Sequence, residues 1–190
     1  MHKHDKCIVS QREIGADSNS YTKALKSVVR QDPDYCLIGE LRDLEAIEVA
    51  LQLAETGHLV FSSLHTNSAV QTINRVVSVF SAEQQDRIRM ILSFTLQAIV
   101  CQKLIASKKG GRVLAYELLL MNSGVRNLIR ENKLHQIETM MQVGQNKSGM
   151  ITLNQSLFNL YKGGHISKDQ AIQNSLDTDA LLKIFEKAGV

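Results

Sequence analysis

The chain has 190 residues, of which 44% are hydrophobic and 22% charged, with a formal net charge of +3. Enough apolar side chain is present to bury a core, which excludes a disordered or fibrous protein. The small net charge, together with 5% aromatic residues and no tryptophan, argues against nucleic-acid binding. The three cysteines, Cys7, Cys36 and Cys101, are far apart and no signal peptide opens the chain, so we expect reduced thiols in a cytoplasmic protein.

The first part of the chain predicts alternating strands and helices. In chain order we expect a strand at 7–9, a helix at 20–29, a strand at 35–38, a helix from 44 to a cap at Gly57, a strand at 59–64 and a helix at 69–80. The second and third strands are continuous apolar runs, which are typical of parallel strands covered on both faces. The helix between them is long enough for a crossover, so we predict a βαβ unit over 35–64.

The second part predicts a change of architecture. The spacing of Ser81 and Gln84 indicates a capping box that opens a long helix reaching about Leu104. Beyond a basic turn at 108–111, we expect a strand at 112–120 and then short helices at 123–131, 133–143, 152–162, 167–174 and 178–187. We therefore predict a three-layer α/β core over 1–121 and an all-helical region over 122–190.

Polar residues follow both strands of the predicted βαβ unit. Glu40 comes directly after the first strand and His65 after the second, at the edge where open parallel sheets bind ligands. A carboxylate there can accept a proton from an attacking water or hold a water on Mg²⁺. Other interpretations stay open: Glu40 could favour the dipole of the next helix, His58 could complement a helix C-terminus, and His65 could be a hydrogen-bonded loop residue. No third ligand is evident near the histidines, so we predict no metal site.

The sequence contains no phosphate-binding loop. No stretch fits G-x-x-x-x-G-K-[ST], and the partial match at 144–149 is followed by Met150 and Ile151, where a Lys and a Ser or Thr are required. Without the backbone amides and the lysine of such a loop, we expect nucleotide affinity to be low and the 190-residue chain to be inactive alone.

The order of the motifs resembles the type II/IV secretion ATPase superfamily. Residues 34–43 (DYCLIGELRD) resemble its Walker B box and residues 56–69 (TGHLVFSSLHTNSA) its His box. Residues 9–13 and 24–33 resemble the segment that precedes Walker B, and residues 2–7 the stretch after the Asp box.

A further resemblance narrows the group. Residues 125–131 (VRNLIRE) are similar to the C-terminal motif of the PilT-type pilus retraction ATPases. Assembly and type II secretion relatives usually carry a four-cysteine module after the His box, and this chain lacks one. The resemblance therefore favours retraction over extension.

The resemblance implies a fold and a set of roles. The chain looks like the C-terminal half of such an ATPase, with a RecA-like P-loop NTPase core that lacks its first strands, followed by an all-helical C-terminal region. Glu40 matches the catalytic glutamate that activates water for attack on the γ-phosphate. Residues matching positions near the nucleotide or the subunit interface are Arg12, Arg30, His58 and His65. The residues that match the retraction motif are Arg126, Asn127, Leu128, Ile129 and Arg130.

The resemblance also implies partners. It predicts Mg²⁺-ATP bound between subunits of a homohexameric ring, which works in the cytoplasm at the periphery of the inner membrane on a pilus platform protein. We expect no nucleic-acid partner. Two alternatives stay open: a truncated, non-enzymatic module that docks into a full-length hexamer, and a fragment of a pilus-assembly or type II secretion ATPase.

Overall fold

The computed structural model describes residues 4–189, without the side chains of 143–148. It separates between Leu64 and His65 into two compact units, named here the N-terminal unit and the C-terminal unit. The first two residues of the 2–7 segment lie outside the described residues. The predicted domain boundary at residue 121 stays a prediction.

The N-terminal unit confirms the predicted βαβ arrangement. It contains α1 (Tyr21–Val28), β1 (Tyr35–Ile38), α2 (Leu44–Glu55) and β2 (Leu59–Ser62). β1 and β2 pair in parallel, with Tyr35 opposite Leu59. Asp43 caps α2 by accepting the Ala46 N–H, and Gly57 follows its end with φ 98°, a conformation that glycine adopts without steric cost.

Two expectations for this unit are wrong. β1 is covered on one face only: Cys36 and Ile38 are buried with residues of α1 and α2, while Tyr35 and Leu37 are 68% and 73% exposed. β2 is largely exposed as well. No strand forms at 7–9, where Ile8 is 95% exposed, because the described residues offer this stretch no strand to pair with.

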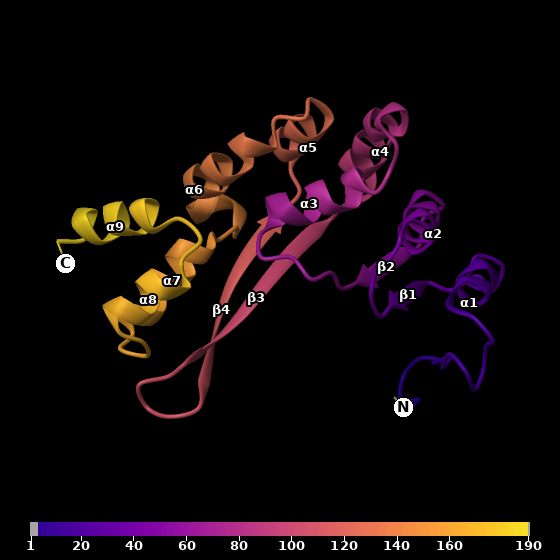
Figure 1. Cartoon of the computed structure of the whole chain (residues 1–190), viewed down its shortest axis with the longest axis horizontal. Helices are drawn as coiled ribbons and strands as arrows, with labels where there is room; N and C mark the ends of the chain where they lie inside the picture. Colours follow the sequence, from indigo (N-terminus) through magenta and orange to yellow (C-terminus); the bar gives the residue numbers. More distant parts are fainter. Residues whose placement is uncertain (1–3, 190) are drawn as a thin grey trace. The chain divides into compact units, whose positions relative to one another are not determined.

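The C-terminal unit is built around a long antiparallel hairpin, β3 (Ala98–Ala106) and β4 (Arg112–Leu120), which α3 and α7 contact (Figure 1). The other elements are α3 (Ala69–Ser78), α4 (Ala82–Thr95), α5 (Ser123–Arg130), a 3-10 turn (Leu134–Gln136), α6 (Ile137–Ser148), α7 (Leu153–Lys162), α8 (Lys168–Asn174) and α9 (Thr178–Lys187). The helices expected after residue 122 are therefore confirmed, with the second opening on a 3-10 turn and extending to Ser148.

The long helix predicted from Ser81 to Leu104 is wrong. It ends at Thr95, and its second half is β3. Here Ile99 and Cys101 are buried while Val100 is exposed, a period-two pattern that burial on one face of the hairpin imposes. The capping box also fails, since the Ser81 hydroxyl donates to Gln84 Oε1 and makes no side-chain cap.

The hairpin is fastened to the last helices near its tip. Gly110 and Gly111 make the turn with φ 89° and 73°. The Lys108 N–H donates to the His165 carbonyl at 2.8 Å, and Gln170 Nε2 donates to the Ala106 carbonyl at 3.0 Å. Core side chains from β3, β4, α7 and α9 meet beneath these contacts; they include Ile105, Ala115, Leu157, Leu181 and Phe185. Among the described residues, none of the helices is long and apolar enough to cross a membrane.

Candidate catalytic site

Glu40 lies just beyond the carboxyl end of β1, as predicted. Its side chain is 25% exposed, and Oε2 accepts a hydrogen bond from Arg42 Nε at 2.7 Å. This contact raises the pKa of the Arg42 guanidinium, first through the hydrogen bond and then through the charge of Glu40. A partly buried carboxylate with a neighbouring counter-ion therefore lies at the edge where open parallel sheets bind ligands.

The backbone around Glu40 is held from two sides. The Tyr21 hydroxyl, on α1, donates to the Glu40 carbonyl at 2.8 Å. On the β2 side, the Ser63 hydroxyl donates to the Gly39 carbonyl at 2.6 Å, and the Leu41 N–H donates to the Ser63 carbonyl at 3.0 Å. The loop that carries the carboxylate is therefore fixed by α1 and by the segment after β2, which limits the positions that the carboxylate can take.

Tyr21 is partly buried, so its hydrogen bond to the Glu40 carbonyl is partly shielded from water. Desolvation raises the pKa of its hydroxyl, while the hydrogen bond to the Glu40 backbone acts in the opposite direction. Tyr21 therefore remains a neutral hydrogen-bond donor throughout the physiological pH range.

His58 lies at the C-terminal end of α2. Its Nδ1 is 3.1 Å from the Leu53 carbonyl and 3.0 Å from Thr56 Oγ1. Because a carbonyl can only accept, Nδ1 carries the proton in the first contact. The histidine thus complements the helix C-terminus, one of the two interpretations open from sequence, and its role toward a nucleotide or a second subunit stays a prediction.

The remaining predicted residues of the N-terminal unit point to solvent. Arg12 and Arg30 are exposed, and their side chains make no hydrogen bond or ion pair within residues 4–189. An unengaged guanidinium is available to an external anion, which agrees with the predicted interface role without testing it.

His65 opens the C-terminal unit and is exposed on the loop before α3. That loop is tied to the helix that follows. Thr66 Oγ1 lies 2.7 Å from Thr72 Oγ1, and the Asn67 N–H donates to Gln71 Oε1 at 3.1 Å. The position of His65 therefore depends on where α3 begins.

The predicted retraction motif forms one amphipathic helix, α5. Leu128 and Ile129 are buried, whereas Asn127 is exposed. Arg126 Nη1 donates to the carbonyls of Ser93 and Phe94 at the end of α4, at 2.5 and 2.9 Å. Arg130 lies over the Phe94 ring, 5.9 Å from its centroid. Both arginines of the motif thus bind α5 to the C-terminal turn of α4, where carbonyls lack helical partners.

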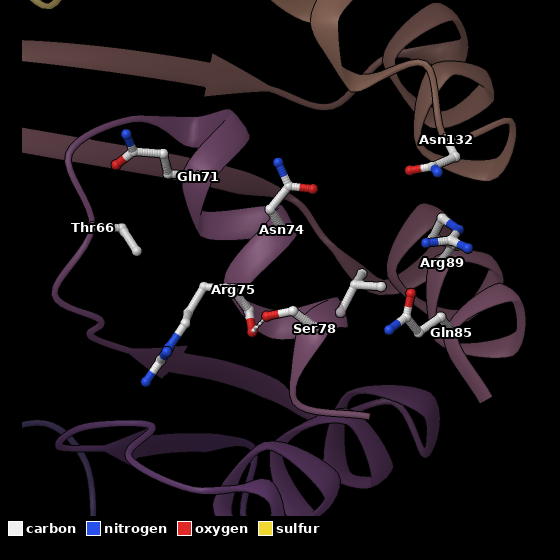
Figure 2. A pocket seen from close by; sticks show the side chains of 9 residues that line it. Thr66, Gln71, Asn74, Arg75, Ser78, Gln85, Arg89 and Asn132 are labelled. Carbon is white, nitrogen blue, oxygen red and sulfur yellow. Dashed lines mark hydrogen bonds between the residues drawn. The ribbon is translucent and has the colours of Figure 1, made fainter. Parts of the chain in front are cut away.

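An open pocket of about 540 Å³, lined mainly by residues with polar side chains, lies in the C-terminal unit between α3, α4 and Asn132, which follows α5 (Figure 2). Arg89, Gln85 and Asn132 gather at one end and Arg75 at the other, as Figure 2 shows. Arg89 is already paired with Asp86 at 2.7 Å. Sequence analysis did not single out this pocket.

Comparison with known proteins places the chain. Residues 8–110 match the family model described as "Type II/IV secretion system protein". The chain belongs to the type II/IV secretion system protein family. It is 47% identical over 171 residues to the "Type IV pilus retractation ATPase PilT" of Pseudomonas aeruginosa, covering 90% of this chain and 49% of that protein. It is 43% identical to the "Twitching motility protein" of Neisseria gonorrhoeae, covering 95% of this chain and 48% of that protein.

Solved structures in this family agree. The structure titled "Crystal Structure of the Pilus Retraction Motor PilT and Bound ADP" matches with a TM-score of 0.89 and 50% identity, covering 96% of this chain and 51% of that one. The ATPase DotB of Legionella pneumophila matches with a TM-score of 0.75 and 26% identity, covering 86% and 44%. These matches confirm the predicted ATPase fold class. The chain spans about half the length of the relatives that it matches.

Sequence reasoning missed the residues that hold Glu40. Arg42 could have been found, since opposite charges two residues apart in a loop can pair, but nothing in the sequence indicated the hydroxyl of Tyr21 or Ser63. Both act on backbone carbonyls distant in the chain, by 19 and 24 residues, and such bonds follow from the fold.

Proposed function

We propose that the chain supplies the Walker B and His-box half of an ATP-hydrolysing subunit that powers type IV pilus retraction, and with it twitching motility. The observation that carries this proposal is the placement of Glu40, fixed at the carboxyl end of β1 and paired with Arg42. The names of the relatives support the same activity, and the phosphate-binding part would come from residues outside the matched half.

In this proposal Glu40 accepts a proton from the water that attacks the γ-phosphate of ATP. Arg42 and the tethered backbone keep the carboxylate in place, so that little reorganisation is needed when the proton moves. Arg12, Arg30, His58 and His65 contact the nucleotide or a neighbouring subunit. The exposed and unengaged guanidinium groups of Arg12 and Arg30 support that assignment.

The finer parts of the proposal concern cofactor, assembly and place. ATP would be used with Mg²⁺, in a homohexameric ring in the cytoplasm, peripheral to the inner membrane, acting on a pilus platform protein. The described residues contain no group of three or more His, Cys, Asp or Glu side chains that could hold a metal ion.

The test is Glu40→Gln, made in a protein that contains this chain together with a phosphate loop. Loss of a general base slows turnover by about 10²- to 10⁴-fold, while nucleotide binding should persist because the phosphate loop is untouched. Turnover is followed by phosphate release and binding by a fluorescent ATP analogue.

The matched control is Glu48→Gln, an exposed acid on α2, which should leave both quantities unchanged. Turnover that survives in Glu40→Gln would contradict the assignment of Glu40. A parent protein that binds ATP without hydrolysing it would instead favour the non-enzymatic docking module.

A further inference from the structure

One buried carboxylate of the C-terminal unit plays no part in the proposed hydrolysis. Glu117, on β4, is 8% exposed, and its Oε1 accepts the Ala69 N–H at 2.7 Å. On the α7 side, the N–H of the neighbouring Tyr116 donates to Ser156 Oγ at 3.0 Å, and the Leu153 N–H lies close enough to lower the pKa of the Glu117 carboxyl. Burial raises the pKa of the Glu117 carboxyl, whereas the Ala69 and Leu153 N–H groups lower it.

These two N–H groups occupy the same position in two different helices. Ala69 is the first residue of α3 and Leu153 the first residue of α7. In each helix the preceding residue, Ser68 or Thr152, caps a later N–H with its hydroxyl. Glu117 supplies an acceptor for the first N–H of α3, which lacks a partner within that helix, and its carboxyl also lies near the first N–H of α7.

One of these helices determines where the His-box loop lies. Thr66 is tied to Thr72 on α3, and the Asn67 N–H is tied to Gln71, so the residues next to His65 follow the first turn of that helix. The Thr72 hydroxyl also lowers the pKa of the Cys101 thiol, and Cys101 lies opposite Glu117 across the hairpin. A continuous set of contacts therefore joins the loop of His65 to Glu117 and, through it, to α7.

We propose that Glu117 is a positioning residue that joins α3 to α7 and so fixes the His65 loop for ATP turnover. The turnover part of this proposal rests on the proposed function. The joining of the two helix N-termini does not, and it can be tested on the chain by itself.

The first experiment measures amide hydrogen exchange by NMR on the full 190-residue chain and on Glu117→Gln. The glutamine keeps the shape of the side chain but replaces one carboxylate oxygen with an NH₂ group, which cannot accept a hydrogen bond, and removes the charge of the carboxylate. We expect exchange at Asn67, Ala69 and Leu153 to accelerate together, by at least about tenfold. Unchanged exchange at α3 or at α7 would overturn the joining role.

Two other variants sharpen this experiment. Glu138→Gln is the matched control. Glu138 is a nearby acid: desolvation raises the pKa of its carboxyl, and the charge of Glu117 raises it further. Within the described residues, no hydrogen bond joins its side chain to the first N–H of α3 or α7. Its exchange at Ala69 and Leu153 should match that of the parent chain. Thr72→Val keeps the helix but cuts the tie to Thr66, so it should accelerate exchange at Asn67 and spare Leu153. If Glu117→Gln fails to fold, Glu117→Asp, which keeps the carboxylate on a shorter side chain, takes its place in this experiment.

The second experiment measures turnover in a protein that joins this chain to a phosphate loop. Glu117→Gln and Thr72→Val should lower kcat by about fivefold or more and leave the KM for ATP within twofold, because phosphate binding is not altered. Parent-like kcat in both variants would overturn the positioning role. Absence of turnover in the parent would contradict the proposed function, while the exchange experiment would still decide the role of Glu117.

Discussion

The two units of the chain bury the apolar side chains of their strands to different extents. In the N-terminal unit, β1 and β2 make a two-stranded parallel sheet that leaves Tyr35, Leu37 and Phe61 exposed within the described residues. In the C-terminal unit, Ala115 and Leu119 of β4 are completely buried, and Ala115 packs in a cluster with residues of α7 and α9, which are distant in sequence. The comparison shows that the proposed catalytic carboxylate lies in the unit with the thinner core, held by hydrogen bonds, while the motif helix lies in the unit with the thicker one.

The largest difference should appear on truncation of an aromatic side chain. Phe185→Ala removes a side chain that is 1% exposed and packs edge-on against Phe158 and Tyr161, so we expect a loss of about 3–5 kcal/mol in the free energy of unfolding. Phe61→Ala, at a side chain that is 54% exposed, should cost less than about 1 kcal/mol. Urea denaturation followed by circular dichroism measures both. Equal losses of unfolding free energy in the two variants would contradict the difference in core thickness between the units.

The buried thiol of each unit should also make stability depend on pH, to a different extent in the two units. Burial, and then the charge of Glu117, raise the pKa of Cys101 from 9.0 to about 11. The unfolded chain thus loses this proton at a lower pH than the folded one, so stability falls between about pH 9 and pH 11, by about 2 kcal/mol at most. Subtracting the pH profile of Cys101→Ala isolates this loss. A smaller loss is expected for Cys36, whose pKa is raised by burial alone.

Arginines of the two units should differ as well. Arg126→Ala leaves two carbonyls at the end of α4 without their charged donor, which should cost about 1–2 kcal/mol. Arg12→Ala, at an exposed loop position, should be neutral for stability within about 0.5 kcal/mol. Thermal unfolding of the two variants, side by side, provides the measurement. An Arg126→Ala protein as stable as its parent would mean that α5 is held by its apolar face alone.

The smallest effect concerns helix caps. Ser20→Ala removes the cap of α1 and Thr152→Ala that of α7, each of which should cost about 1 kcal/mol. Thr152 is buried and takes part in a capping box, so its loss should be the larger. Chemical denaturation resolves the order of the two; the reverse order would show that burial in the C-terminal unit adds nothing to this cap.

Sequence patterns predicted local structure well where one periodicity dominated. The helix predicted at 167–174 is confirmed, with Ser167 as its cap, and the turn predicted at 108–111 is confirmed, with Gly110 and Gly111 at positive φ. The helix predicted over 98–104 is wrong, because a short apolar run after a helix is compatible with both a helix and a strand. Only pairing with residues 112–120 decides between the two. Sequence patterns failed again at 7–9, where β-branched residues have no neighbouring strand.

For the site, the sequence could place Glu40 at the end of β1, because an acid directly after an apolar strand is a local pattern. Its catalytic role came from the resemblance of residues 34–43 to a Walker B box and stays a prediction. The sequence could not predict the ties that hold Glu40, nor the role of Glu117, whose carboxyl lies near N–H groups 48 and 36 residues away in the chain. A carboxylate inside a strand looks ordinary until the fold shows which backbone groups converge on it.

The fastening of the hairpin tip has a kinetic consequence. Gln170 Nε2 donates to the Ala106 carbonyl, 64 residues away in the chain, and Lys103 Nζ donates to the Asn174 carbonyl, 71 residues away. Such contacts raise the mean sequence separation of neighbours, and chains with high contact order fold slowly. During synthesis the hairpin emerges well before α8, so its outer half must wait for the end of the chain before its last backbone groups are satisfied.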